Sequence, residues 1–199
     1  MEHDRLRAAF DRFDAENARD EHREPLDGQL VPGELLYARR MSAWLGRVAP
    51  DASEALRLAA RAQHIRRWEI PRDTYPMTRA GYHQWRTRLG QFHAQVAGEI
   101  LRDVGFDEAI VARVQSLIRK ERLKQDPEAQ MLEDVICLVF LESYFADFAK
   151  QHDEQKVIGI LRKTWRKMSP RGHELALQLP LTPEARSLVE RALPSSTDS

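Results

Sequence analysis

Apolar residues recur at helical spacing along almost the whole chain. After Asp107, for example, they return every three or four positions and form one stripe: Ile110, Val111, Val114, Leu117 and Ile118. No stretch alternates apolar and polar residues over a useful length, and no internal repeat is visible. The pattern therefore predicts an all-α protein.

Helix-breaking and helix-capping residues divide this pattern into segments. Residues 21–33 are expected to form a loop, because two prolines and two glycines interrupt them. Serine, threonine and aspartate precede several apolar stripes, as N-caps do, and Gly105 stands where a long helix would end. We expect helices over residues 5–18, 34–48, from 51 or 53 to about 68, 78–103, 107–118, 126–150, 153–168 and a short one from 182. They would form one helical bundle over residues 1–193, followed by a disordered tail over residues 194–199.

The composition is typical of a soluble globular protein, with 42% hydrophobic and 31% charged residues in a chain of 199. This length supports one domain with a substantial core. The longest apolar run, Val135–Leu141, is far too short to cross a bilayer, and the N-terminal segment MEHDRLRAAF lacks the apolar region of a signal peptide. We therefore expect a cytoplasmic protein with no membrane partner, in which the single cysteine, Cys137, is a packed thiol.

The segment Arg61–Arg88 is the main candidate for a binding site. It contains seven arginines but only two acids, Glu69 and Asp73, although the whole chain has a formal net charge of zero. Guanidinium groups bind carboxylate and phosphate through paired hydrogen bonds, and aromatic rings stack on bases or sugars. The segment therefore predicts a site for a small anionic or phosphorylated ligand; the alternative is a solvated basic helix face. The predicted ligand-binding residues are Arg67, Trp68, Arg72, Tyr75, Arg79, Trp85 and Arg86.

Charge is arranged in blocks near the C-terminus. Residues 126–154 carry eight acids and one base, whereas residues 156–171 carry six bases and no acid. On a functional interpretation, four residues of the basic block join the earlier arginines around the same anion: Lys163, Arg166, Lys167 and Arg171. On the alternative interpretation, the basic block pairs with the acidic one.

Three further residues form a candidate metal site. His64 and His93 fall on helix stripes that face inward, and Asp134 lies among apolar residues. An isolated buried carboxylate is costly, so Asp134 must be paired, protonated or bound to an ion such as Mn, Fe, Zn, Ni or Mg. The alternatives are a hydrogen-bonded core histidine and an aspartate paired with arginine.

Residues 52–145 resemble HD-domain phosphohydrolases in the order of their elements: His64, then FHAQVAGEILRDVGFDEAIVARVQSLIRKE, then DPEAQMLEDVICLVFLE. The resemblance implies an HD-like helical domain in which His64 is the first metal ligand and Asp134 the last. His93 falls where many members carry an additional histidine. The chain departs from the family because no His-Asp pair follows His64, and His83-Gln84 stands nearest to that place.

The whole chain more closely resembles an uncharacterised family, domain-of-unknown-function family four-two-zero-two. The stretches that carry this resemblance are RWEIPRDTYPMTRAGYHQWR, LIRKERLKQDPEAQMLEDVICLVFLE and ILRKTWRKMSPRGHELAL. Some members of that family carry a glutamyl-tRNA synthetase label, and Lys167–Arg171 is similar to the lysine-methionine-serine loop of class I synthetases. The companion histidine-glycine-histidine motif and the alternating strands of a nucleotide-binding sheet are both missing, so we reject that assignment.

These observations leave three functional hypotheses. The first is a metal-dependent phosphohydrolase of a small phosphorylated metabolite or nucleotide, with Glu99 or Glu133 as the catalytic base or as the group that orients a histidine. The second is a non-catalytic protein that binds a nucleotide or another anion in a degenerate HD-like pocket. The third is an RNA-binding module, which the zero net charge and the missing recognition motifs disfavour. The oligomeric state stays open.

Overall fold

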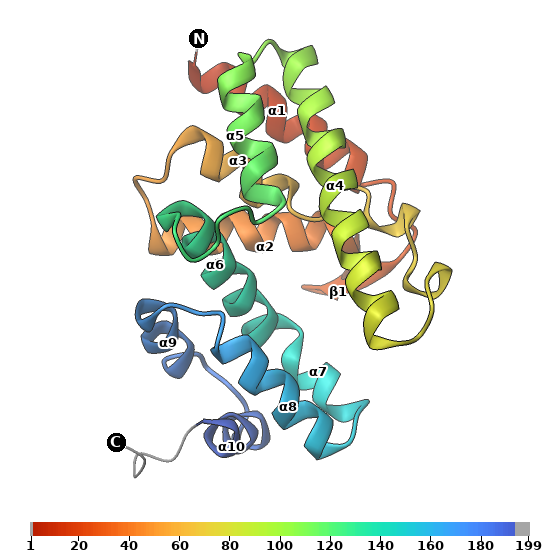
Figure 1. The fold of residues 1–199 in the computed structure, drawn as a ribbon, viewed down its shortest axis with the longest axis vertical. Coiled ribbons are helices and arrows are strands. Elements are labelled where there is room, and N and C mark those ends of the chain that lie inside the picture. The colour runs from red at the N-terminus through yellow and green to blue at the C-terminus, as the bar shows by residue number, and fades with distance from the viewer. Residues whose placement is uncertain (1, 194–199) are drawn as a thin grey trace. The chain divides into compact units, whose positions relative to one another are not determined.

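The computed structural model describes residues 2–193, and within this range the chain is helical apart from turns and one short hairpin (Figure 1). The all-α prediction is confirmed. The chain forms two compact units, residues 1–132 and residues 133–199, and the boundary falls inside helix α6 (Pro127–Ser143). The predicted tail over residues 194–199 lies outside the described residues, and the expectation of a single domain stays a prediction.

In unit 1, the short helix α3 packs against three longer helices. Helix α3 contacts α1, α2 and α5, and the long α4 runs beside α5 (Figure 1). Alanines on α3 allow this close approach, because Ala59, Ala60 and Ala62 are fully buried. The helices of this unit are α1 (Glu2–Asn17), α2 (Gly33–Val48), α3 (Glu54–Ala62), α4 (Arg79–Val104), α5 (Glu108–Ile118) and the first part of α6.

Side-chain caps place most of the helix starts where the sequence predicts them. The side chain of Ser53 accepts a hydrogen bond from the amide of Leu56, and Thr78 and Asp107 act in the same way three residues before the amides that they bind. Gly105 ends α4 with φ of 90°, a conformation that glycine adopts at little cost.

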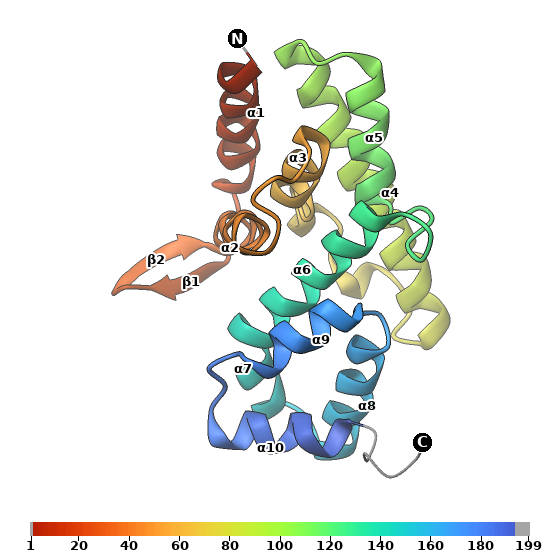
Figure 2. The same ribbon diagram turned by 90° about the vertical axis from the view of Figure 1, so that its left-hand side faces the viewer.

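The predicted loop over residues 21–33 contains a hairpin instead. Strands β1 (Arg23–Leu26) and β2 (Gln29–Pro32) pair antiparallel, and Figure 2 shows them extending away from α2. Asp27 and Gly28 connect them with φ of 49° and 78°, as a two-residue turn requires. The prolines indicated a loop, but Asp-Gly is a stronger signal for a hairpin.

Helix α3 ends at Ala62, six residues before the predicted end. Arg66 adopts the left-handed conformation with φ of 55°, and its amide donates to Oδ1 of the buried Asn17 at 3.1 Å. This turn is followed by two short 3₁₀ helices, η1 (Arg67–Glu69) and η2 (Arg72–Thr74). The helix stops because this contact with α1 replaces continued helical hydrogen bonding.

Unit 2 contains the rest of α6 and four shorter helices. Helix α8 packs against α10, and α7 contacts both of them. The helix predicted over residues 126–150 is interrupted at Tyr144, where φ is −127°, and α9 was not predicted. Cys137 is buried, as expected of a packed thiol. The four helices are α7 (Phe145–Lys150), α8 (Glu154–Trp165), α9 (Pro170–Leu177) and α10 (Pro183–Ala192).

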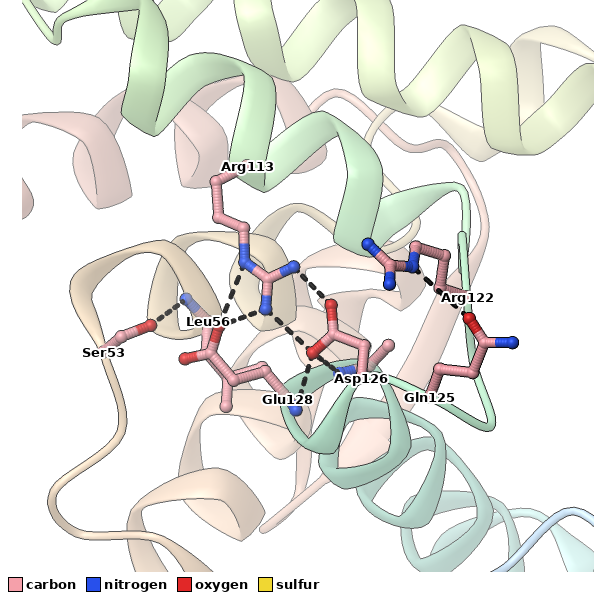
Figure 3. Close-up of polar contacts among 8 residues, drawn as sticks. Ser53, Leu56, Arg113, Arg122, Gln125, Asp126 and Glu128 are labelled. Carbon is pink, nitrogen blue, oxygen red and sulfur yellow. Dashed lines mark hydrogen bonds and ion pairs between the residues drawn. The ribbon is translucent and has the colours of Figure 1, made fainter.

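The start of α6 is held by an arginine on α5. Both terminal nitrogens of Arg113 donate to the carboxylate of Asp126, and its Nε donates to Glu128 at 3.1 Å (Figure 3). Asp126 also caps α6, because its Oδ1 accepts from the amide of Glu128 at 3.0 Å. These hydrogen bonds hold the pKa of Asp126 at about 2, below its ordinary value.

None of the helices within residues 2–193 combines the length and the apolar character needed to cross a membrane.

Candidate anion-binding site

Two histidines from different elements meet in unit 1. His64 lies in the turn after α3 and His93 lies in the middle of α4, and their ring centroids are 5.9 Å apart. The side chain of His64 is 14% exposed, and His93 as a residue is 2% exposed. The sequence therefore predicted correctly that both histidines face inward.

His93 is held as a neutral imidazole with one free acceptor. Its Nδ1 lies 2.7 Å from the carbonyl oxygen of Ile65, so Nδ1 carries the proton and donates it. Burial is the main cause that lowers the pKa of His93 to about 3, and the charges of Arg67 and Arg86 act in the same direction. Nε2 therefore carries a lone pair, and among the described residues it has no hydrogen-bond partner.

His64 is sandwiched between an aromatic ring and a guanidinium group. Its ring stacks on Tyr37 at a centroid distance of 4.0 Å, with an angle of 10° between the planes. Nη1 of Arg67 lies 3.0 Å from Nε2 of His64 and 3.3 Å from Nδ1. Burial, and then the charge of Arg67, hold the pKa of His64 well below its usual range, so His64 is neutral at physiological pH.

Glu34, on the first turn of α2, belongs to the same cluster and was not predicted. Its Oε2 lies 3.5 Å from Nδ1 of His64, and its Oε1 lies 3.8 Å from Nε of Arg67. Burial raises the pKa of Glu34 to about 7 against the opposing effect of Arg67, and the nearby Asp20 and Glu24 add to the rise. The available signal was an acid that directly precedes two apolar residues in GELLY.

A cavity of about 210 Å³ opens beside the histidines. At roughly 30 Å³ per water molecule, it has room for a phosphate group and a few further atoms. Arg86, Arg119 and Lys120 contribute positive charge, and Arg119 also pairs with Glu121 at 2.7 Å. The lining residues are Gln63, His64, Arg86, Thr87, Leu89, Gly90, His93, Ile118, Arg119 and Lys120.

Lys120 reaches the cavity from a strained backbone position. Its φ is 58°, and its amide donates to Leu117 while that of Glu121 donates to Ser116, which is the pattern of a Schellman helix end. Glycine is the preferred residue at this position, because a side chain there costs conformational energy. A lysine in this place is therefore a candidate functional residue, and its charge also lowers the pKa of His64.

Several arginines of the Arg61–Arg88 segment have structural partners, among them Arg61 and Arg66, which were not predicted to bind the ligand. Arg61 forms a two-pronged ion pair with Asp14 at 2.7 and 2.6 Å, and Arg66 pairs with Glu69. Arg72 donates to the carbonyl oxygens of residues 75 and 76, both at 2.9 Å, and so closes the loop before α4. Arg79 is exposed at the start of α4. Of the predicted ligand-binding arginines, Arg86 lines the cavity, and Arg67 contacts His64, which also lines it.

The predicted aromatic residues surround the loop before α4 rather than the cavity. Trp85 is buried, and its Nε1 donates to the carbonyl oxygen of Ile70 at 2.9 Å. The guanidinium carbon of Arg67 lies 5.2 Å from the centre of a Trp85 ring. Trp68 and Tyr75 are half-buried, and neither lines the cavity. Trp85 therefore supports Arg67, and through it His64.

Asp134 has a structural partner in unit 2. Its carboxylate accepts from the amide of Ser169 at 2.8 Å and from the Ser169 hydroxyl at 2.5 Å. Ser169 in turn caps α9 by accepting from the amide of Gly172 at 3.0 Å. The Lys167–Arg171 segment that is similar to a synthetase loop is therefore a helix start, with Pro170 at its first position.

The donor groups do not fit a resident metal ion. Among residues 2–193, no three His, Cys, Asp or Glu side chains are grouped so that they could hold one. His64 already faces the guanidinium of Arg67, which repels a second cation. The predicted ion on His64, His93 and Asp134 stays a prediction, and no chemical step is derived from it.

The remaining predicted residues lie on other surfaces. Glu99 is exposed on α4 and accepts from Gln95 at 2.9 Å. In unit 2, the buried Glu133 lies 3.6 Å from Nζ of Lys167, and the exposed Arg171 pairs with Glu174 at 3.1 Å.

Residues 7–189 match the family described as domain of unknown function (DUF4202), and the chain belongs to that family. No curated protein and no solved structure matches the chain. The HD-domain resemblance stays a prediction.

Proposed function

We propose that this member of the DUF4202 family binds a small phosphorylated metabolite in the cavity of unit 1. The observation that carries the proposal is the convergence of Arg86, Arg119 and Lys120 on one cavity that carboxylates do not line. Cationic side chains that face a half-enclosed space repel one another, and a bound anion offsets that repulsion.

Arg86 is the central residue of the proposal. It is half-buried, and it forms no hydrogen bond or ion pair with any residue in the described part of the chain. Its charge acts on both neighbouring imidazoles, His64 and His93, and lowers the pKa of each. A guanidinium whose donors are not used by other described residues is suited to bind phosphate oxygens in pairs.

The test is calorimetric titration with inorganic phosphate and small phosphate esters. We expect Arg86→Met to weaken binding at least about tenfold, because a charged hydrogen bond is lost. Arg88→Met is the matched control, because Arg88 is exposed on the same helix and does not line the cavity. Equal binding by wild type and Arg86→Met would contradict the proposal.

Hydrolysis of the bound ester is a second candidate, and Glu34 favours it. Glu34 does not line the cavity, but its carboxyl group, with a pKa of about 7, lies 3.5 Å from the imidazole of His64, which does, so it can act through His64 in general acid–base catalysis near neutral pH. We expect Glu34→Gln to lower kcat for release of phosphate while it leaves phosphate binding within about threefold of wild type. If wild type releases no phosphate from a panel of esters, with or without added divalent ions, binding alone remains.

A further inference from the structure

We infer that the ligand of this cavity is the phosphate monoester of a polyol, whose hydroxyl groups donate to Nε2 of His93 and Oε1 of Gln63. The inference rests on the proposed anion site and adds the chemistry of the rest of the ligand. It comes from two buried acceptors that the anion itself cannot satisfy.

The first acceptor is Nε2 of His93. The hydrogen bond from Nδ1 to Ile65 fixes the tautomer, so Nε2 has a lone pair and no proton. His93 is 2% exposed and lines the cavity, and Nε2 has no partner within the described residues. An acceptor buried in this way is costly unless a donor reaches it.

The second acceptor is the side-chain oxygen of Gln63, at the end of α3. Gln63 is 4% exposed and lines the same cavity, and its Oε1 is also without a partner among the described residues. An amide oxygen accepts hydrogen bonds but cannot donate them. Both acceptors therefore need O–H or N–H groups from the ligand.

A fully ionised phosphate group cannot supply those donors. Its oxygens only accept, so they suit Arg86 and Lys120 but repel the lone pairs of His93 and Gln63. A ligand that satisfies both halves of the cavity carries an anion at one end and hydroxyl donors at the other. The volume of about 210 Å³ limits the enclosed part to a phosphate and a short polyol chain.

The experiment compares esters that differ only in their hydroxyl groups. Glycerol 3-phosphate and ribitol 5-phosphate are titrated against propyl phosphate and pentyl phosphate, with inorganic phosphate as the reference. Wild type is expected to bind the polyol esters at least about tenfold more tightly, because an unpaired buried acceptor is costly. Gln63→Met, which keeps the side-chain length, is expected to reduce this ratio.

A spectroscopic readout on wild type makes the result independent of how the variant folds. The nitrogen-15 shift of Nε2 of His93 is expected to move upfield when glycerol 3-phosphate binds and to stay unchanged with propyl phosphate. Equal affinity for the two classes, or an unchanged shift at saturation, overturns this inference and leaves the anion site standing. Failure of every phosphate to bind overturns the proposed function as well.

Discussion

Nη1 of Arg67 lies 3.0 Å from Nε2 of His64, so a guanidinium group already occupies one side of the ring that the HD resemblance assigns as the first metal ligand. Tyr37 covers the face of the same ring, at a centroid distance of 4.0 Å. The arrangement favours an anion beside His64 over a second cation.

Metal content tests this relationship directly. We expect wild type purified without chelator or histidine tag to retain well below one divalent ion per chain. Arg67→Met is expected to raise the uptake of Zn²⁺ or Mn²⁺, because it removes the repelling charge and frees the ring nitrogen. Arg66→Met is the control, because Arg66 pairs with Glu69 and does not line the cavity. A near-stoichiometric ion in wild type would contradict this expectation and support the metal-dependent hydrolase.

The raised pKa of Glu34 predicts a specific pH dependence of stability. Folding raises the pKa from 4.5 to about 7, so between these values the folded state binds more protons than the unfolded state. The contribution of Glu34 is therefore fully present below about pH 4.5 and is lost as the pH rises toward 7. His64 and His93 have the opposite effect: because burial lowers their pKa values, they reduce the stability of the folded state as the pH falls below 6.5.

Urea unfolding at pH 5, 6, 7 and 8 gives the free energy of unfolding of wild type and of Glu34→Gln. The difference between the two at each pH is the contribution of Glu34. We expect the variant to gain stability relative to wild type as the pH rises through this window. Glu69→Gln, at a more exposed carboxylate, serves as the control. A difference between wild type and Glu34→Gln that does not change with pH would show that Glu34 titrates normally.

Lys120→Gly separates stability from ligand binding. Glycine relieves the left-handed backbone at φ of 58°, by about 1 kcal/mol, so the variant is expected to be at least as stable as wild type. Phosphate binding is expected to weaken about tenfold or more, because a cation of the cavity is lost. Arg122→Gly is the matched control: its φ is 55°, but it does not line the cavity, so phosphate affinity should not change. If Lys120→Gly bound phosphate as tightly as wild type, Lys120 would not contribute to the binding site.

Gly172→Ala tests the structural role assigned to Asp134. A methyl group at position 172 would lie 2.7 Å from Oδ1 of Asp134, so we expect a loss of about 2–3 kcal/mol in unfolding free energy. At Gly159, on α8, a methyl group meets open space, and Gly159→Ala is expected to gain about 0.5–1 kcal/mol from helix propensity. Similar effects of the two substitutions on chemical denaturation would contradict this account of Asp134.

The sequence by itself determined the helical class and most of the helix starts, because a cap is a local interaction. Ser53, Thr78 and Asp107 each bind an amide three residues ahead, so their positions can be read without knowledge of the fold. The missed hairpin was also readable, since Asp27-Gly28 is a local turn signal.

Only the tertiary structure decided which charged residues share a site. Arg61 pairs with Asp14, 47 positions away, whereas Arg86 lines a cavity; nothing local distinguishes these two arginines. Glu34 reaches His64 because α2 packs against α3, and this packing also raises its pKa through burial. Contacts between distant segments depend on how apolar faces pack, and desolvation depends on those contacts, so the local pattern could suggest an anion site but could not assemble it.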